Sequence, residues 1–170
     1  LSTQYGATIV FVDDFLEAQQ VIKDIETTEG RIFVPAWGDP RLSLGTASLG
    51  LELKEQTPPL DACVVAIGGG SICAGAGTLL KSVWPDCKIL AAEPEGAATM
   101  LRSFASGKVE YLEKRETIAE GLAPPNSCDY FMPICRACVD SLQAMSDHHI
   151  VEAMRFLFDE AKLAIEPSGA

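Results

Sequence analysis

One apolar run constrains the fold of this chain more than any other feature. Residues 62–67, Ala-Cys-Val-Val-Ala-Ile, show no alternation with polar residues. Such a run is typical of a strand that is buried on both faces of a parallel sheet. Gly68, Gly69, Gly70 and Ser71 follow at once, and residues 72–83, which are rich in small side chains, are expected to form a helix. The order of strand, glycine turn and helix predicts a βα unit.

The same alternation of short apolar runs and amphipathic stretches extends along the chain. Asp13 or Asp14, and Ser146, are the residue types that favour the N-cap of a helix. Strands that alternate with helices in this way predict an α/β fold, with a doubly wound, mostly parallel sheet flanked by helices. We expect further strands at residues 8–12, 31–34 and 88–92, and further helices after Asp14, at about 43–55, at 97–106, at 131–138 and after Ser146.

The length of the chain bears on its domain organisation. A chain of 170 residues suits one domain, so residues 1–170 are expected to form a single α/β cofactor-binding domain. The chain lacks an initiator methionine and stops at Ala170, where a new element begins. We therefore expect a fragment that is truncated at both ends. Ligands of parallel sheets bind beyond the carboxyl ends of the strands, which here means the glycine run and Glu93.

Composition excludes two classes of partner. The net charge is −11 and the basic residues are scattered singly, whereas nucleic-acid binders carry a basic stripe. No apolar run approaches the roughly 18 residues that a membrane span requires. Cys135 and Cys138 have a CxxC spacing, but no second pair accompanies them, so free thiols on a helix are expected rather than a zinc or redox site. Because free thiols persist in a reducing compartment, we expect the protein to be cytoplasmic.

The glycine run favours an anion site. Three consecutive glycines are costly in backbone entropy, and their N–H groups can turn toward one anion at a helix N-terminus. A tight turn without a ligand is the alternative. Residues 72–78 lack the lysine of a Walker A loop, so ATP or GTP hydrolysis is disfavoured. A dinucleotide site is a closer match, with Glu93 near the ribose, although Cys73 stands where the third glycine belongs.

Six stretches, in order, resemble the fold-type II pyridoxal-phosphate family, in its serine/threonine dehydratase and serine racemase branch. They include a strand start Tyr-Gly-Ala-Thr-Ile-Val, the glycine run itself, Ala-Glu-Pro-Glu-Gly-Ala, Thr-Ile-Ala-Glu-Gly-Leu-Ala and Glu-Pro-Ser-Gly-Ala. The stretches are residues 5–10, 39–52, 66–72, 92–97, 117–123 and 166–170. Together they span nearly all of the chain.

The resemblance implies a role for each matching residue. Pyridoxal 5'-phosphate is the implied cofactor, with its phosphate on backbone amides from Gly68 to Ile72 and its ring near Gly121, Trp37 and Glu166. Ser71 stands where the family has a fourth glycine. The cofactor-binding residues implied are Gly68, Gly69, Gly70, Ser71, Ile72, Gly121, Trp37 and Glu166.

The resemblance also implies a structural Mg²⁺ or Ca²⁺ at Glu93, Ala97 and Thr99. Thr99 replaces an acid that is common at this position, which weakens the expected site. The lysine that forms the Schiff base belongs in a Ser-x-Lys-x-Arg-Gly-like context, and none of the seven lysines in this chain has those neighbours. No catalytic residue is therefore expected in this chain, and the lysine is expected upstream.

The activity implied is that of an ammonia-lyase or racemase acting on a small amino acid. Removal of the α-proton and loss of water would give a 2-oxo acid and ammonia, whereas reprotonation on the opposite face would racemise the substrate. Serine and threonine are both left open as substrates, and a homodimer is expected. The rival interpretations are a nicotinamide-binding oxidoreductase domain and a non-catalytic phosphate-binding module.

Overall fold

A computed structural model describes residues 1–36 and 38–170, with the side chains of Phe15 and Leu16 excepted. The chain divides into two compact units, of which the first is Leu1–Ala36 and the second contains the described residues that follow. The prediction of one domain over residues 1–170 stays a prediction. The elements are η1 (Ser2–Tyr5), α1 (Phe15–Glu29), α2 (Pro40–Gln56), β1 (Ala62–Ala66), η2 (Cys73–Gly77), α3 (Thr78–Val83), β2 (Lys88–Pro94), η3 (Glu95–Ala97), α4 (Thr99–Ser106), η4 (Glu120–Leu122), α5 (Phe131–Cys138), β3 (Ser141–Met145), α6 (Asp147–Asp159) and η5 (Pro167–Gly169).

The first unit contains η1 and α1. Asp14 caps α1 as predicted, because its carboxylate accepts the Glu17 N–H at 2.9 Å, and Gly30 ends the helix with a φ of 65°. The predicted strands at residues 8–12 and 31–34 are wrong, since both stretches have irregular backbone. Neither stretch has a partner strand within the described residues, and a strand cannot satisfy its N–H and C=O groups alone.

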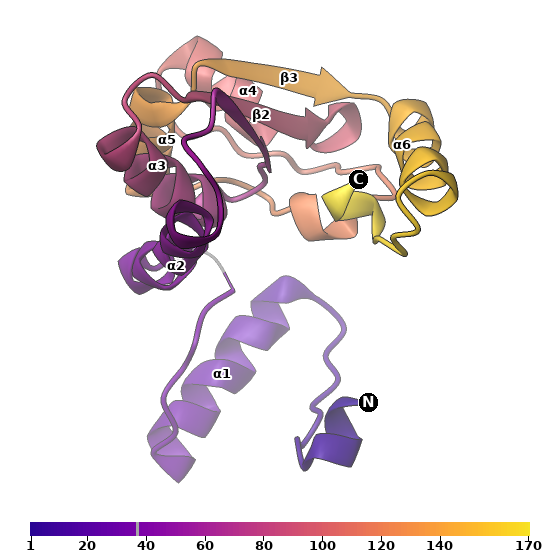
Figure 1. Ribbon diagram of the computed structural model, residues 1–170. Helices are drawn as coiled ribbons and strands as arrows, with labels where there is room; N and C mark the ends of the chain where they lie inside the picture. Colours follow the sequence, from indigo (N-terminus) through magenta and orange to yellow (C-terminus); the bar gives the residue numbers. More distant parts are fainter. Residues whose placement is uncertain (37) are drawn as a thin grey trace. The chain divides into compact units, whose positions relative to one another are not determined.

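The second unit is built on a three-stranded parallel sheet in the order β1-β2-β3. Figure 1 shows β2 and β3 side by side, with β3 leading into α6. The register pairs Ala66 with Ala92, and Pro94 with Met145, so the carboxyl ends of the strands lie at one edge. The sequence did not predict β3, whose residues Ser-Leu-Gln-Ala-Met include no β-branched side chain.

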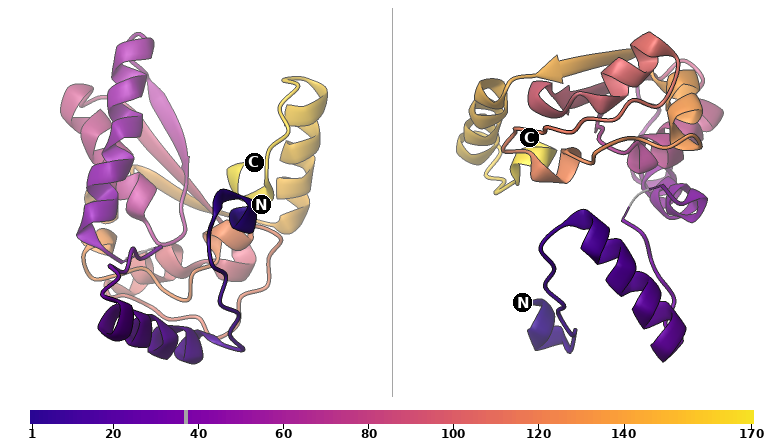
Figure 2. Two further views of the ribbon diagram at one scale, coloured as in Figure 1. Left: turned by 90° about the horizontal axis from the view of Figure 1, so that it is seen from below. Right: turned by 180° about the vertical axis from the view of Figure 1, so that it is seen from behind.

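One face of the sheet carries the core. Val65, Ile89 and Ala91 point to this face and pack with buried side chains of α3, α4 and α5, among them Leu80, Met100 and Phe131. Val64, on the opposite face, is 74% exposed. The prediction that residues 62–67 are buried on both faces is therefore wrong for the described residues, because no helix among them covers β1 at Val64. The predicted fold class, a mostly parallel sheet with flanking helices, is confirmed (Figures 1 and 2).

The helix after the glycine run packs unusually close to α2. Residues 73–77 form one π-helical turn that continues into α3. A Cβ on Gly75 would collide with Thr46 Oγ1 and the Ser43 carbonyl of α2, so only glycine permits this approach. The close packing of this helix against α2 thus explains its small side chains. Within the described residues, none of the helices has the length and apolar character that crossing a membrane requires.

Candidate functional site

The glycine loop, residues 68–72, begins where β1 ends. The Ile67 N–H donates to the Ala92 carbonyl at 2.9 Å, so pairing with β2 continues up to the first glycine. Gly70 then adopts a φ of +94°, in the left-handed region that favours glycine. A Cβ there would lie 2.8 Å from Met100 Cε and 3.1 Å from Cys135 Sγ. Position 70 therefore requires glycine for its conformation and for its space.

The carbonyl groups of the glycine loop are held by side chains from three other segments. The hydroxyl of Ser127 donates to the residue 69 carbonyl at 3.1 Å, and the thiol of Cys135 donates to the residue 70 carbonyl at 3.3 Å. Thr46, from α2, donates to the residue 71 carbonyl at 2.7 Å. These three bonds fix the direction in which the loop's peptide groups point.

The N–H groups of the loop are in a different situation. In the described part of the protein, those of Gly68, Gly69 and Gly70 donate no hydrogen bond to another protein group. Ser71 begins the helical backbone, where N–H groups have no intrahelical acceptor. Consecutive N–H donors beside a helix N-terminus form an anion site, because the donors and the helix dipole both favour negative charge. The loop therefore fits the phosphate of the cofactor that the sequence implied.

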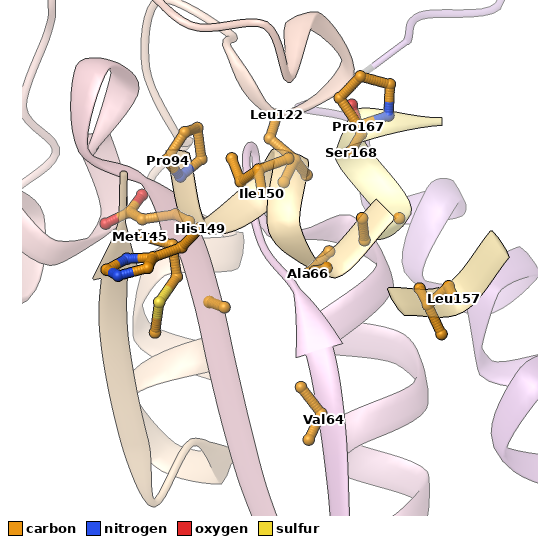
Figure 3. Close-up of a pocket in the computed structure, with 15 residues that line it drawn as sticks. Val64, Ala66, Pro94, Leu122, Met145, His149, Ile150, Leu157, Pro167 and Ser168 are labelled. Carbon is orange, nitrogen blue, oxygen red and sulfur yellow. The ribbon is translucent and has the colours of Figure 1, made fainter. Parts of the chain in front are cut away.

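A second predicted segment, residues 117–123, lies against this loop. A Cβ on Gly68 would be 3.0 Å from Leu122 Cα, so the two backbones are in contact. The Gly121 N–H donates to Ser168 Oγ at 3.1 Å, and a Cβ on Gly121 would be 3.8 Å from Glu166 Oε1. Figure 3 shows Leu122 beside Ser168. The structure thus brings the glycine loop, Gly121 and Glu166 together, whereas Trp37 lies outside the described residues.

The three predicted metal ligands, Glu93, Ala97 and Thr99, also lie near one another, but their polar atoms have protein partners. Both carboxylate oxygens of Glu93 accept N–H groups at the start of α4, from Met100 at 3.0 Å and from Leu101 at 2.6 Å. Thr99 Oγ1 donates to the Ala97 carbonyl at 3.3 Å. Within the described residues, no three His, Cys, Asp or Glu side chains gather into a metal-binding group. The metal stays a prediction.

Glu93 is 1% exposed, and its pKa is raised from 4.5 to about 7. The main cause is burial, which disfavours the charged carboxylate. The N–H donors of α4 and the positive charge of Arg102 act in the opposite direction and lower the pKa, but less strongly. Glu93 therefore acts as the N-terminal cap of α4 and is close to half protonated near neutral pH.

A cavity of about 500 Å³ opens beside Glu93, at the carboxyl edge of the sheet (Figure 3). Most of its lining is apolar, with Met145, Ile150 and Leu157 around it and His149 at one side. Leu122 and Ser168 also line it, so the cavity adjoins the segment that contacts Gly68. No pattern along the chain indicated this cavity, because its walls come from β1, β2, α6 and η5 together.

The CxxC cysteines are buried in α5. Cys138 donates to the Cys73 carbonyl at 3.7 Å, and the neighbouring Cys73 thiol together with burial raises the pKa of Cys138 far above its ordinary value. All six cysteines are free thiols, as expected for the CxxC pair. A buried thiol with a raised pKa, such as that of Cys138, is a packing group rather than a nucleophile.

Thr46, Ser127 and Ser168 support the site without having been singled out from the sequence. Thr46 and Ser168 fall inside stretches that carried the family resemblance, so motif membership was the signal that could have found them. Ser127 lies 58 residues from the glycine it bonds, and no local pattern marks it.

Comparisons with known proteins agree with this arrangement. A family model described as "Pyridoxal-phosphate dependent enzyme" matches residues 1–170. The chain is 42% identical over 170 residues to a phenylserine dehydratase of Ralstonia pickettii, covering 100% of this chain and 52% of the relative. It is 35% identical over 168 residues to a serine racemase of Oryza sativa subsp. indica, covering 98% of this chain and 49% of the relative.

A solved structure of maize serine racemase has a TM-score of 0.93 and 34% identity, over 99% of this chain and 51% of that one. The chain thus spans about half the length of the curated relatives it matches. The family model covers every residue, the relatives agree over the full chain, and the backbone superimposes on that of maize serine racemase. The chain belongs to the pyridoxal-phosphate-dependent enzymes.

Proposed function

We propose that this chain supplies the phosphate-binding part of an enzyme that uses pyridoxal 5'-phosphate to dehydrate or racemise a small hydroxy amino acid. The glycine loop carries the proposal, because the N–H groups of its three glycines have no acceptor among the described protein groups and the carbonyls of residues 69–71 are fixed. Relatives named as a phenylserine dehydratase and a serine racemase support the reaction class. Serine and threonine are the proposed substrates.

Each residue of the site has its own task in this proposal. The N–H groups from Gly68 to Ile72 hold the phosphate, and the contact of Leu122 with Gly68 closes one side of the loop. The Gly121 backbone and the Glu166 carboxylate border the ring. When bound, the cofactor supplies a ring that takes up the negative charge left by removal of the α-proton. The lysine that holds the cofactor is proposed to lie outside this sequence.

Ser71→Pro tests the loop by removing one N–H donor. Proline suits the first position of a helix, and Gly70 has no Cβ to collide with the proline ring. Loss of one hydrogen bond to a charged phosphate should weaken the binding of pyridoxal phosphate about 10- to 100-fold. Ser71→Ala, which keeps the N–H, is the control and should bind as the wild type does. Spectroscopic titration measures both affinities.

The same titration separates the rival functions. The proposal predicts that pyridoxal phosphate binds more tightly than NADH and that Ser71→Pro weakens it. Binding of NADH in preference to pyridoxal phosphate would support the nicotinamide-binding domain instead. Equal affinity of Ser71→Pro and Ser71→Ala for pyridoxal phosphate would show that the loop is only a turn.

We also propose that the Glu93 region takes up Mg²⁺ or Ca²⁺ weakly, with water completing the coordination. Oxygen ligands suit both cations, and the Ala97 carbonyl and Thr99 hydroxyl lie near the Glu93 cap. Thr99→Asp adds a carboxylate at this buried position. Without cation, repulsion between the two acids should lower the melting temperature, and excess Ca²⁺ should restore it by ligand-linked stabilisation. If the wild type and Thr99→Asp each give the same melting curve with chelator as with Ca²⁺, the metal is excluded.

A homodimer and a cytoplasmic location complete the proposal. Sedimentation of the protein at several concentrations measures its oligomeric state, and a single monomer species throughout would exclude the dimer.

A further inference from the structure

Asp147 joins two segments that lie 30 residues apart in the sequence. Thr117 donates its hydroxyl to Asp147 Oδ1 at 2.6 Å, and the Ile118 N–H donates to Asp147 Oδ2 at 3.0 Å. Thr117 Oγ1 in turn accepts the Ala119 N–H at 3.1 Å. Both carboxylate oxygens of Asp147 and the Thr117 hydroxyl thus hold the start of the 117–123 segment.

Asp147 is not needed to cap its own helix. Ser146 performs that task, because its hydroxyl accepts the His149 N–H at 3.3 Å. The carboxylate of Asp147, in the first turn of α6, is therefore directed to the other segment. Asp147 is half-buried, so water competes with these hydrogen bonds less than it would at a fully exposed site.

The 117–123 segment has a second attachment at Gly121. The N–H of Gly121 donates to Ser168 Oγ at 3.1 Å, and η4 and η5 lie next to each other. Figure 1 shows these two short turns together near the C-terminus. Ala119, between the two attachments, is fully buried, and Leu122, just beyond them, contacts Gly68. The backbone at Gly121 is therefore fixed from both sides.

We propose that Asp147 is a positioning residue: through Thr117 and Ile118 it holds the Gly121 backbone at the distance from the glycine loop that the cofactor ring requires. The inference rests on the proposed function, since it assigns the ring to the side of Gly121. Within the described residues, the Asp147 carboxylate makes no hydrogen bond to the glycine loop or to Gly121. A carboxylate suits this task because both donors, a hydroxyl and an N–H, need an acceptor, and an asparagine offers only one acceptor oxygen.

The experiment compares Asp147→Asn, Thr117→Val and Thr117→Ser with the wild type. Thr117→Val removes the hydroxyl that donates to Asp147, and Asp147→Asn leaves one acceptor oxygen for the two donors, whereas Thr117→Ser keeps the hydroxyl and should behave as the wild type does. Glu152→Gln, an exposed change on the same helix, is the matched control. We expect about tenfold weaker binding of pyridoxal phosphate for the first two variants, as loss of one hydrogen bond predicts. Affinity for inorganic phosphate should not change, because the glycine loop is untouched.

The double variant Asp147→Asn/Thr117→Val should bind pyridoxal phosphate about as weakly as either single variant, because both changes break one attachment. Equal losses of affinity for pyridoxal phosphate and for inorganic phosphate would show general damage and would overturn the proposal. Unchanged affinity of both breaking variants for pyridoxal phosphate would overturn it as well.

Amide hydrogen exchange separates failure of this proposal from failure of the proposed function, because it needs no cofactor. In Asp147→Asn we expect exchange at Ile118 and at Gly121 to accelerate, each by about tenfold. Faster exchange at Ile118 alone would show that the attachment is local and does not position Gly121. If the wild type binds no pyridoxal phosphate, the proposed function fails, whereas the exchange at Gly121 still decides whether Asp147 fixes this backbone.

Discussion

Gly70→Ala is expected to lower the free energy of unfolding by about 2–5 kcal/mol. Gly70 has a φ of +94°, where an alanine is strained. Its new methyl group would also lie 2.8 Å from Met100 Cε, which is fully buried and therefore confined. Strain and overpacking act together at this one position, so the effect should exceed that of an ordinary substitution.

Urea unfolding measures this loss, and Gly45→Ala is the matched control. Gly45 lies inside α2, and no atom of another described segment comes within 4 Å of the place that an alanine methyl group would take. Alanine there should raise stability by about 0.5–1 kcal/mol through helix propensity. A Gly70→Ala midpoint equal to that of the wild type would mean that the glycine loop does not have the described conformation.

Glu93→Gln is expected to change how stability depends on pH. The pKa of Glu93 is about 7 in the folded protein and about 4.5 when unfolded, so the folded state keeps a proton that the unfolded chain has lost. The contribution of Glu93 to the free energy of unfolding of the wild type is therefore greatest below pH 4.5 and is lost as the pH rises to about 7. Glutamine does not titrate, so the stability of the variant relative to the wild type should rise over this range by on the order of 3 kcal/mol.

Unfolding curves of both proteins at several pH values measure that difference. Glu95→Gln, a change at an exposed acid two residues further on, serves as the control and should follow the wild type. A constant difference between Glu93→Gln and the wild type from pH 4.5 to about 7 would contradict the buried, helix-capping position of Glu93.

Local signals in the sequence account for what was predicted correctly. The glycine loop follows a continuous apolar run, and both features can be seen in ten consecutive residues. The caps of α1 and α6 were equally visible, because Asp14 and Ser146 bond N–H groups only three residues away. In these cases the residues that interact are neighbours in the sequence.

Features that depend on distant partners were missed or wrong. Residues 8–12 have high β-propensity, but a strand needs a partner, and none exists among the described residues. Strand β3 lacks such propensity and forms because β2 offers an edge for pairing. Asp147 was not singled out from the sequence, since its partner Thr117 is 30 residues away. Glu93 was recognised, but its role as a cap depends on where α4 begins.

The central claim is that the glycine loop binds the phosphate of pyridoxal phosphate through its backbone N–H groups. The most direct test follows the amide NMR signals of residues 68–72 while pyridoxal phosphate, and separately pyridoxal, is added to the labelled protein. The claim predicts large, saturable shifts of these amides with pyridoxal phosphate and much smaller ones with pyridoxal, because a hydrogen bond to a charged phosphate strongly perturbs the N–H group. Pyridoxal phosphate that binds without shifting these five amides would contradict the claim.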